Sequence, residues 1–399
     1  MYVLTAKNSN RLMKKYFYQI FLILFLCGNF SDTIWAQKPP IMGWSSWNHF
    51  RIHIDEKIIR EQADALIISG LYDAGYRFIN IDDGYFAGRD AKDNLLVDSV
   101  KFPSGMKSLV DYIHAKGLKA GIYSDAGENT CGSIYDNDKN GVGVGLYGHL
   151  DQDCNKFFRE WGFDFIKVDW CGGEKMNLDE KTEYLKIIRT VKAINPEIVF
   201  NICRWKFPGE WAIHEADSWR ISGDIRNTFE SILHIIDLDA DLYRYASAGH
   251  YNDMDMLQVG RGMTYDEDKS HFSMWCMLNS PLLAGNDLRN MSEQTIEILT
   301  NKEIIALNQD EGFKQAVRIF KENDIEIWKK TLGKNGESSA LAILNRGNHP
   351  IEFSLTPQNS GLRDNAYLRD LWRHSNIGKL GKSQTFVIPT HGIIVLKTL

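Results

Sequence analysis

Eight short apolar runs recur between residues 41 and 287, and helix-like stretches separate them. Each run has the length of a strand, and the stretches between runs carry apolar residues at helical spacing, as in residues 56–75, 107–117 and 182–196. Gly117 and Pro196 are typical stop signals for the last two stretches. The runs lie at 41–44, 78–83, 119–125, 164–170, 198–203, 218–224, a weaker one near 245–253, and 281–287.

This alternation predicts a (β/α)8 TIM barrel, because eight strand–helix units are what such a barrel needs. A doubly wound open sheet is the alternative. Almost every run ends in a carboxylate, Tyr, Lys or Arg at its C-terminal side. In a barrel those ends meet at one mouth, whereas an open sheet would collect them only around its switch point. We therefore expect an α/β barrel with its functional site at the mouth.

The sequence texture changes after about residue 308. Apolar and polar residues alternate there, and turn signals separate the segments, which is typical of antiparallel strands. We expect a catalytic barrel over residues 37–307 and a C-terminal antiparallel β-sandwich domain over residues 308–399. The strand-like segments lie at 325–332, 338–346, 351–355, 366–372 and 385–399.

The first 36 residues have the pattern of an export signal. An apolar run at 16–27 follows three basic residues, and a plausible cleavage site lies near Ala36. Twelve residues span only ~18 Å as a helix, too little to cross a membrane. We therefore expect a signal peptide over residues 1–36, no membrane span, and a secreted or periplasmic protein. The basic residues are Arg11, Lys14 and Lys15.

Two further points concern this segment. Met13 is a second candidate start, because it leaves a compact basic region before the apolar run. Cys27 raises the question of a lipid anchor, but bulky Leu26 stands where lipoprotein cleavage sites have a small residue. We therefore favour export without lipidation.

Charge and aromatic content narrow the class of partner. The net charge is −6 over 399 residues, without a basic stripe, which argues against a nucleic-acid partner. The chain has 11 Trp and 16 Tyr, which suit either a sugar-binding cleft or a large core.

After export five cysteines besides Cys27 remain, so a monomer keeps at least one free thiol.

Acidic residues follow several of the predicted strands. A carboxylate in that place is costly to bury unless it is paired or used. For Asp253 and Asp255 we favour capping of the next helix. For Asp169 the interpretation as a helix cap is less favoured. Lys167 lies two residues earlier on the same strand face and would keep the Asp169 carboxylate ionised, as a nucleophile requires. The other candidates are Asp82, Asp83 and Asp224.

Glycoside hydrolysis needs two carboxyl groups across the scissile bond, and one barrel mouth can supply both. Spacing alone does not say which of these aspartates they are. A catalytic metal is not expected, because the chain has no HExxH or paired-His spacing, and the acidic run at 237–241 lacks the glycine of a calcium loop. No cofactor is expected either.

Several motifs in order carry a family resemblance over residues 39–310. The chain resembles glycoside hydrolase family 27, the α-galactosidase and α-N-acetylgalactosaminidase family, and its C-terminal β domain also fits. The motifs are MGWSSWNHF, NIDDGYF, KFPSGMKSLVDYIHAKGLKAGIYSDAG, TCGS, KVDWCGG, SWRISGDI, NDMDMLQVG and SPLLAGNDLRNM.

The resemblance implies roles for the two central carboxylates. The Asp of the family's K-x-D-x-C pattern is the nucleophile, here Asp169, and the Asp of its W-R-x-x-x-D pattern is the acid/base, here Asp224. Their carboxyl groups should lie ~5–5.5 Å apart, and the anomeric configuration should be retained. The substrate would be a glycan with a terminal α-D-galactosyl residue.

The resemblance also implies the sugar contacts. Asp82 and Asp83 should bind O4 and O6, Lys167 should bind O3 and O4, and Arg220 should bind O2. Acceptors and a donor on the axial O4 would penalise the wrong epimer. Because both acidic residues are intact, a hexose with a free O6 is favoured over a pentose. Two residues should line the pocket and two should form a disulfide beside it: Trp47 and Tyr123, and Cys131 and Cys171. The other thiols, those of Cys154, Cys203 and Cys276, should be structural and buried.

The chain departs from the family at two places. Arg204 stands where the α-galactosidases have a Glu that contacts O2, and Gly84 with Tyr85 replaces a Cys-Trp pair. Two interpretations of Arg204 stay open: it alters recognition at C2, or it turns away and pairs with Glu210 or Glu215. α-N-Acetylgalactosaminidase and β-L-arabinopyranosidase activities therefore remain alternatives, as does a non-catalytic sugar-binding barrel.

Overall fold

The computed structural model describes residues 38–399. Eight parallel strands form one sheet in the order β10-β1-β2-β5-β6-β7-β8-β9. They occupy the eight predicted runs, the weak one included, which confirms the barrel. The strands are β1 (Met42–Ser45), β2 (Phe78–Asn80), β5 (Lys119–Asp125), β6 (Phe165–Asp169), β7 (Val199–Cys203), β8 (Ser218–Arg220), β9 (Tyr251–Asp253) and β10 (Leu282–Ala284).

Leu257 joins the two ends of this sheet. Its N–H donates to the carbonyl of Leu283 at 2.8 Å, and its own carbonyl accepts from the N–H of Gly285 at 3.1 Å. Leu257, in the loop after β9, therefore pairs with β10 and closes the ring. Closure brings the carboxyl ends of all eight strands to one mouth.

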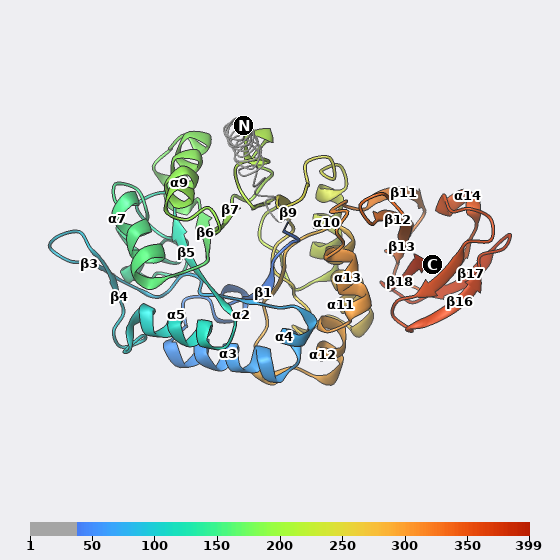
Figure 1. The fold of residues 1–399 in the computed structure, drawn as a ribbon, viewed down its shortest axis with the longest axis horizontal. Helices are drawn as coiled ribbons and strands as arrows, with labels where there is room; N and C mark the ends of the chain where they lie inside the picture. The colour runs from blue at the N-terminus through green and yellow to red at the C-terminus, as the bar shows by residue number, and fades with distance from the viewer. Residues whose placement is uncertain (1–37) are drawn as a thin grey trace, which may run out of the picture. The chain divides into compact units, whose positions relative to one another are not determined.

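Helices cover the outside of the strands, and α3 lies beside α5 (Figure 1). The side chain of Asp55 caps α3 by accepting a hydrogen bond from the amide of Ile58. Buried residues of α3 repeat at helical spacing, as Ile59, Ala63 and Leu66 do. The longer helices are α3 (Glu56–Ile68), α5 (Gly105–Ala115), α9 (Glu180–Ile194), α10 (Phe229–Asp239), α11 (Tyr265–Met277), α12 (Glu293–Leu299) and α13 (Lys302–Asn308).

Shorter elements fill the connections. The predicted stretch at 56–75 divides into α3 and α4 because Gly70 has a left-handed backbone, with φ 84°. The β3–β4 hairpin and the π-helical turn η2 after α7 were not expected from the sequence. These elements are α2 (Trp47–Phe50), α4 (Leu71–Ala74), β3 (Phe86–Arg89), β4 (Leu95–Val97), α6 (Cys131–Tyr135), η1 (Lys139–Gly141), α7 (Leu150–Cys154), η2 (Asn155–Trp161), α8 (Cys171–Lys175), η3 (Glu210–Ala212) and η4 (Leu288–Asn290).

The C-terminal strands form two antiparallel sheets, as predicted (Figure 1). One has the order β11-β12-β13-β18-β15-β16, and the other pairs β14 with β17. The predicted segment at 385–399 divides into β17 and β18 at a turn that contains Pro389 and His391, which has φ 56°. The elements are β11 (Val317–Glu322), β12 (Ile325–Leu332), β13 (Ser338–Asn345), β14 (Ile351–Leu355), α14 (Pro357–Ser360), β15 (Tyr367–Asp370), β16 (Ser375–Lys379), β17 (Gln384–Ile388) and β18 (Ile393–Thr398).

Three apolar clusters hold these layers. The largest fills the barrel and extends to Trp328, Ala342 and Val395 of the C-terminal strands, and a second lies within the C-terminal sheets. A small third cluster joins side chains of three barrel strands: Phe78, Phe165 and Val199. Within residues 38–399, no helix combines the length and the apolar character that a membrane crossing needs. The predicted signal peptide over residues 1–36 lies outside the described residues.

Candidate active site

A cavity of about 330 Å³ opens at the carboxyl ends of the barrel strands. Its volume lies at the small end of the ~300–1,000 Å³ typical of ligand pockets, which suits a single sugar ring. Both predicted catalytic residues line it, one on β6 and the other on the loop after β8. The lining residues are Trp47, Asn48, Arg51, Cys131, Tyr135, Lys167, Asp169, Cys171, Cys203, Trp205, Arg220, Asp224, Asp255 and Met256.

Asp169 and Asp224 differ sharply in their exposure. Asp169 ends β6 and leaves only 6% of its side chain exposed, whereas Asp224 lies beyond the end of β8 with 67% of its side chain exposed. The cavity therefore has one carboxylate in its wall and another at its open side.

Lys167 sets the charge around Asp169. Its Nζ lies 2.9 Å from Oδ2 of Asp82 and 3.5 Å from Oδ2 of Asp169. Burial by itself lowers the pKa of Lys167, but the two carboxylates raise that pKa well above its ordinary value and keep the ammonium charged. Burial raises the pKa of Asp169, and the Lys167 charge opposes that rise. The cation thus favours the ionised form of the Asp169 carboxylate in the cavity wall.

Arg220 holds a second group of charges. Its Nη2 lies 2.7 Å from Oδ2 of Asp255 and 3.1 Å from Oδ1 of Asp224, and its Nη1 donates to Sγ of Cys203 at 3.7 Å. Burial lowers the pKa of Arg220, but the neighbouring acidic groups, Asp255 foremost, raise it far more. The guanidinium therefore stays charged and links the exposed carboxylate of Asp224 to the buried one of Asp255.

The expected role of Asp255 as a helix cap is wrong. α11 begins after Thr264, whose side chain caps it, and Asp255 instead pairs with Arg220 and accepts from the amide of Ile225 at 2.9 Å. Its backbone has φ 77°, a left-handed conformation that turns the chain after β9. Asp253 does not cap α11 either, since its carboxylate accepts from the side-chain amide of Asn201 at 2.8 Å.

The predicted disulfide joins Cys131 to Cys171, with Cα atoms 5.2 Å apart. It lines the cavity and connects α6 to α8, directly after Asp169. The remaining predicted thiols, those of Cys154, Cys203 and Cys276, are free and buried. Cys203 also borders the cavity beside Arg220.

The four sugar-binding candidates Trp47, Asp82, Asp83 and Tyr123 do not all border the same space. Trp47 lines the cavity, while Asp82 and Tyr123 line a smaller space of about 30 Å³ that shares Lys167 and Arg220 with it. Asp83 is fully buried, and its carboxylate accepts from the amides of Gly84 at 2.8 Å and Gly132 at 2.7 Å.

Arg204 turns away from the cavity. Its Nε donates to Glu180 at 2.9 Å, and its Nη2 lies 3.5 Å from Glu174. It therefore pairs with acidic residues, as one interpretation held, but with those of α8 and α9 rather than with Glu210 or Glu215. Its neighbour Trp205 lines the cavity instead.

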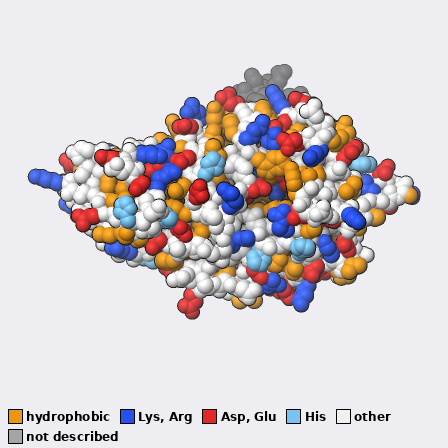
Figure 2. Space-filling model, turned by 180° about the vertical axis from the view of Figure 1, so that it is seen from behind, with side chains coloured by type: hydrophobic (Ala, Val, Ile, Leu, Met, Phe, Trp, Pro, Cys, Tyr) orange, Lys and Arg blue, Asp and Glu red, His pale blue; other side chains and the backbone are white. Residues whose placement is uncertain are grey.

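Arg51, Tyr135 and Trp205, which no expectation from the sequence includes, complete the mouth. Arg51 stacks on Trp47, with 4.6 Å from its guanidinium carbon to the ring centroid, and its side chain donates to Asp136 at 2.7 Å. Trp205 and Tyr135 add aromatic surface. The high Trp and Tyr content of the chain was the only feature of the sequence that pointed to these aromatic side chains. Acidic and basic side chains are interspersed over the face in Figure 2, without a field of a single sign.

A (β/α)8 barrel whose mouth holds aromatic side chains and carboxylates around a monosaccharide-sized cavity fits a glycoside hydrolase, since that reaction needs two carboxyl groups beside one sugar ring. The family model described as "Alpha galactosidase A" matches residues 39–310, and "Alpha galactosidase C-terminal beta sandwich domain" matches residues 322–398. The chain therefore belongs to the α-galactosidase family, glycoside hydrolase family 27.

Individual relatives agree over most of their length. The α-galactosidase A of Cellvibrio japonicus is 40% identical over 90% of this chain and 92% of its own. The α-galactosidase 2 of Arabidopsis thaliana is 40% identical over 88% of this chain and 87% of its own. The crystal structure of α-galactosidase I from Mortierella vinacea superposes with a TM-score of 0.84 at 31% identity, covering 92% of this chain and 98% of its own.

Proposed function

We propose that this enzyme hydrolyses terminal α-D-galactosyl residues of glycans with retention of configuration, using Asp169 as nucleophile and Asp224 as acid/base. The observation that carries the proposal is the pairing of a buried carboxylate beside an ammonium with an exposed carboxylate across one sugar-sized cavity. The sugar follows from relatives named α-galactosidases at 40% identity.

In the first step a carboxylate oxygen of Asp169 attacks the anomeric carbon, and the bond from that carbon to the leaving oxygen breaks. The proton of Asp224 moves to the leaving oxygen, and a covalent galactosyl ester forms on Asp169. In the second step Asp224 takes a proton from water, the water oxygen attacks the anomeric carbon, and the ester bond breaks. Two inversions at one carbon give net retention.

The other residues bind or orient in this account. Lys167 lines the cavity and pairs with Asp82, which borders the smaller neighbouring space. We expect this pair to offer a donor and an acceptor to ring hydroxyls, which would favour an axial O4. Arg220 fixes Asp224 and borders the space expected for O2. The contact predicted between Asp83 and the sugar stays a prediction, as do the wall contacts of Tyr123 and Trp47.

The domain limits and the site of action are part of the same proposal. A catalytic domain over residues 37–307 is supported by the end of α13 at Asn308 and the start of β11 at Val317. We place the enzyme outside the cytoplasm because residues 1–36 have the export pattern, and its substrate would be a glycan met there.

A product-anomer experiment tests this proposal. The enzyme is given the nitrophenyl glycosides of α-galactose, N-acetyl-α-galactosamine and β-L-arabinopyranose, and the first product is followed by NMR. We expect turnover of the α-galactoside and α-galactose as the first product. Asp169→Asn should lower kcat by at least about 10⁴-fold, comparable with the loss of other nucleophiles. β-Galactose as the first product, or an active Asp169→Asn enzyme, would contradict the mechanism. Faster turnover of one of the other two glycosides would mean that the preferred sugar is not α-galactose.

A further inference from the structure

Asp125 is a buried carboxylate that the proposed mechanism leaves unused. It ends β5 and is the register partner of Asp169 on β6, and the amide of Ala126 donates to the carbonyl of Asp169 at 2.9 Å. The side chain is fully buried, and Asp125 is absent from the residues that line the cavity. It therefore lies next to the nucleophile without reaching the substrate.

One oxygen of this carboxylate holds three backbone amides. Oδ1 of Asp125 accepts from Gly127 at 2.7 Å, Gly172 at 3.0 Å and Gly173 at 3.3 Å. Two of these donors follow Asp169 within four residues. The carboxylate thus ties its own loop to the segment that leaves the nucleophile strand.

Close backbone contact makes this arrangement possible. A Cβ on Gly127 would lie 2.1 Å from the carbonyl carbon of Gly172, and a Cβ on Gly172 would lie 2.8 Å from Oδ1 of Asp125. Only glycine fits at either position without moving the backbone. The two loops are therefore packed against each other at the point where the carboxylate binds both.

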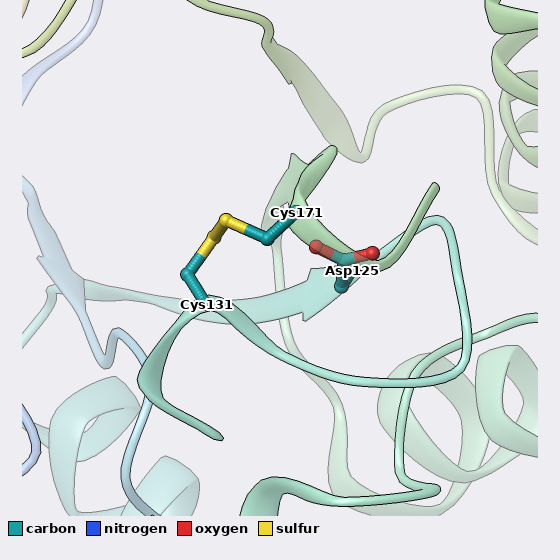
Figure 3. A group of neighbouring side chains, drawn as sticks. All are labelled: Asp125, Cys131 and Cys171. Atoms are coloured by element: carbon teal, nitrogen blue, oxygen red, sulfur yellow. A yellow bond between two sulfur atoms is a disulfide. The ribbon is translucent and has the colours of Figure 1, made fainter. Parts of the chain in front are cut away.

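The disulfide restrains the same segment from its other side. In Figure 3 the Asp125 carboxylate lies beside the bond between Cys131 and Cys171. A carboxylate oxygen of Asp125 and the two sulfurs all lie within 4.8 Å of one another. Within residues 38–399, Oδ2 of Asp125 has no hydrogen-bond partner. Because the sulfurs are bonded to each other, we interpret the group as a structural brace rather than a metal site.

We propose that Asp125 is a positioning residue for the nucleophile: with the disulfide, it holds residues 171–173 so that Asp169 keeps its aim at the anomeric carbon. This inference rests on the role proposed for Asp169. Burial raises the pKa of Asp125 to about 7, so below that pH the neutral acid predominates. The accepting carbonyl oxygen is then the essential feature, and an asparagine would supply it.

Three variants test the inference. Asp125→Ala removes the acceptor, and we expect kcat to fall by about 10–100-fold with KM changed less than about 3-fold, because small misplacements at a reacting group are costly. Asp125→Asn keeps the acceptor and should restore kcat to within about 3-fold of wild type. Asp268→Asn is the matched control. Asp268 is also a buried aspartate with a pKa of about 7, and its carboxylate accepts a hydrogen bond from the backbone amide of Gly260. Its kcat should not change.

Two further measurements do not depend on catalysis. Hydrogen exchange of the wild-type enzyme should show protected amides at Gly172 and Gly173, and dithiothreitol should reduce the disulfide about 10-fold faster in Asp125→Ala than in wild type. Unprotected amides, wild-type kcat in Asp125→Ala, or an Asp125→Asn enzyme as impaired as Asp125→Ala would each overturn the inference. If Asp169→Asn remained active while these amides were protected, the proposed function would fail and the brace would stand.

Discussion

The ammonium of Lys167 lies 3.5 Å from the carboxylate of Asp169, two residues further along the same strand. This pair predicts how activity depends on pH. An opposite charge favours the ionised carboxylate, so removing the cation with Lys167→Met should raise the pKa of Asp169 further. The acidic limb of kcat/KM, which reports ionisation in the free enzyme, should then move to higher pH.

The matched control is Lys167→Arg, which keeps the charge in a different shape. Its acidic limb should stay close to that of wild type even if substrate binding weakens. An unshifted limb in Lys167→Met would mean that another group controls the acidic side of the profile.

Asp224 should matter most when the leaving group needs a proton. We expect Asp224→Ala to lower kcat/KM by about 10²–10⁴-fold for a disaccharide, and far less for a dinitrophenyl galactoside, whose phenolate leaves unassisted. A series of aryl galactosides measures this as a steeper dependence on the pKa of the leaving group. Equal losses across the series would remove Asp224 from the role of acid.

Arg204 should affect stability rather than sugar recognition. Its guanidinium pairs with Glu180 and Glu174 outside the cavity, so Arg204→Met should change KM for an α-galactoside by less than about 3-fold. The loss of two partly exposed ion pairs should lower the free energy of unfolding by about 1 kcal/mol. Urea titration and steady-state kinetics measure the two effects. A large rise in KM alone would show that the side chain enters the cavity when substrate binds.

Lys330 should hold the C-terminal strands to the barrel. It is buried on β12, and its Nζ donates to the carbonyls of Met277 at 3.2 Å and Lys314 at 2.7 Å, and to the side chain of Asn279. Lys330→Met leaves these acceptors without their donor, which should lower the free energy of unfolding by about 1–3 kcal/mol. Lys334→Met removes an exposed ion pair and should change it by less than about 0.5 kcal/mol. Equal effects in the two variants would contradict the docking role.

The barrel could be predicted because its strands are local apolar runs with a fixed order. The ends of the strands were harder to predict. β2 stops at Asn80 and β8 at Arg220, although the next residues, Ile81 and Ile221, are apolar and buried in the core. Apolar composition reports burial, whereas the ladder ends where backbone pairing ends. The predicted runs were therefore longer than the strands.

Long-range pairing limited the prediction of the site. The sequence favours a helix cap for Asp255, because nothing near it in the sequence reveals an ion pair with Arg220. Glu210 and Glu215 lie near Arg204 in the sequence, but the fold brings Glu180 closer to it, and Glu210 accepts from the hydroxyl of Tyr245. The pairing of Lys167 with Asp169 is predictable because the two residues lie two positions apart on one strand face.

The most direct test of the mechanism is to trap its intermediate. A fluorinated galactosyl fluoride forms a covalent ester with the enzyme quickly, and this ester hydrolyses slowly. The labelled enzyme can therefore be digested and its peptides sequenced by mass spectrometry. The account predicts one sugar per active site, attached to Asp169, and no labelling of Asp169→Asn. A label on Asp224 or any other residue, or turnover of the substrate without a covalent intermediate, would contradict it.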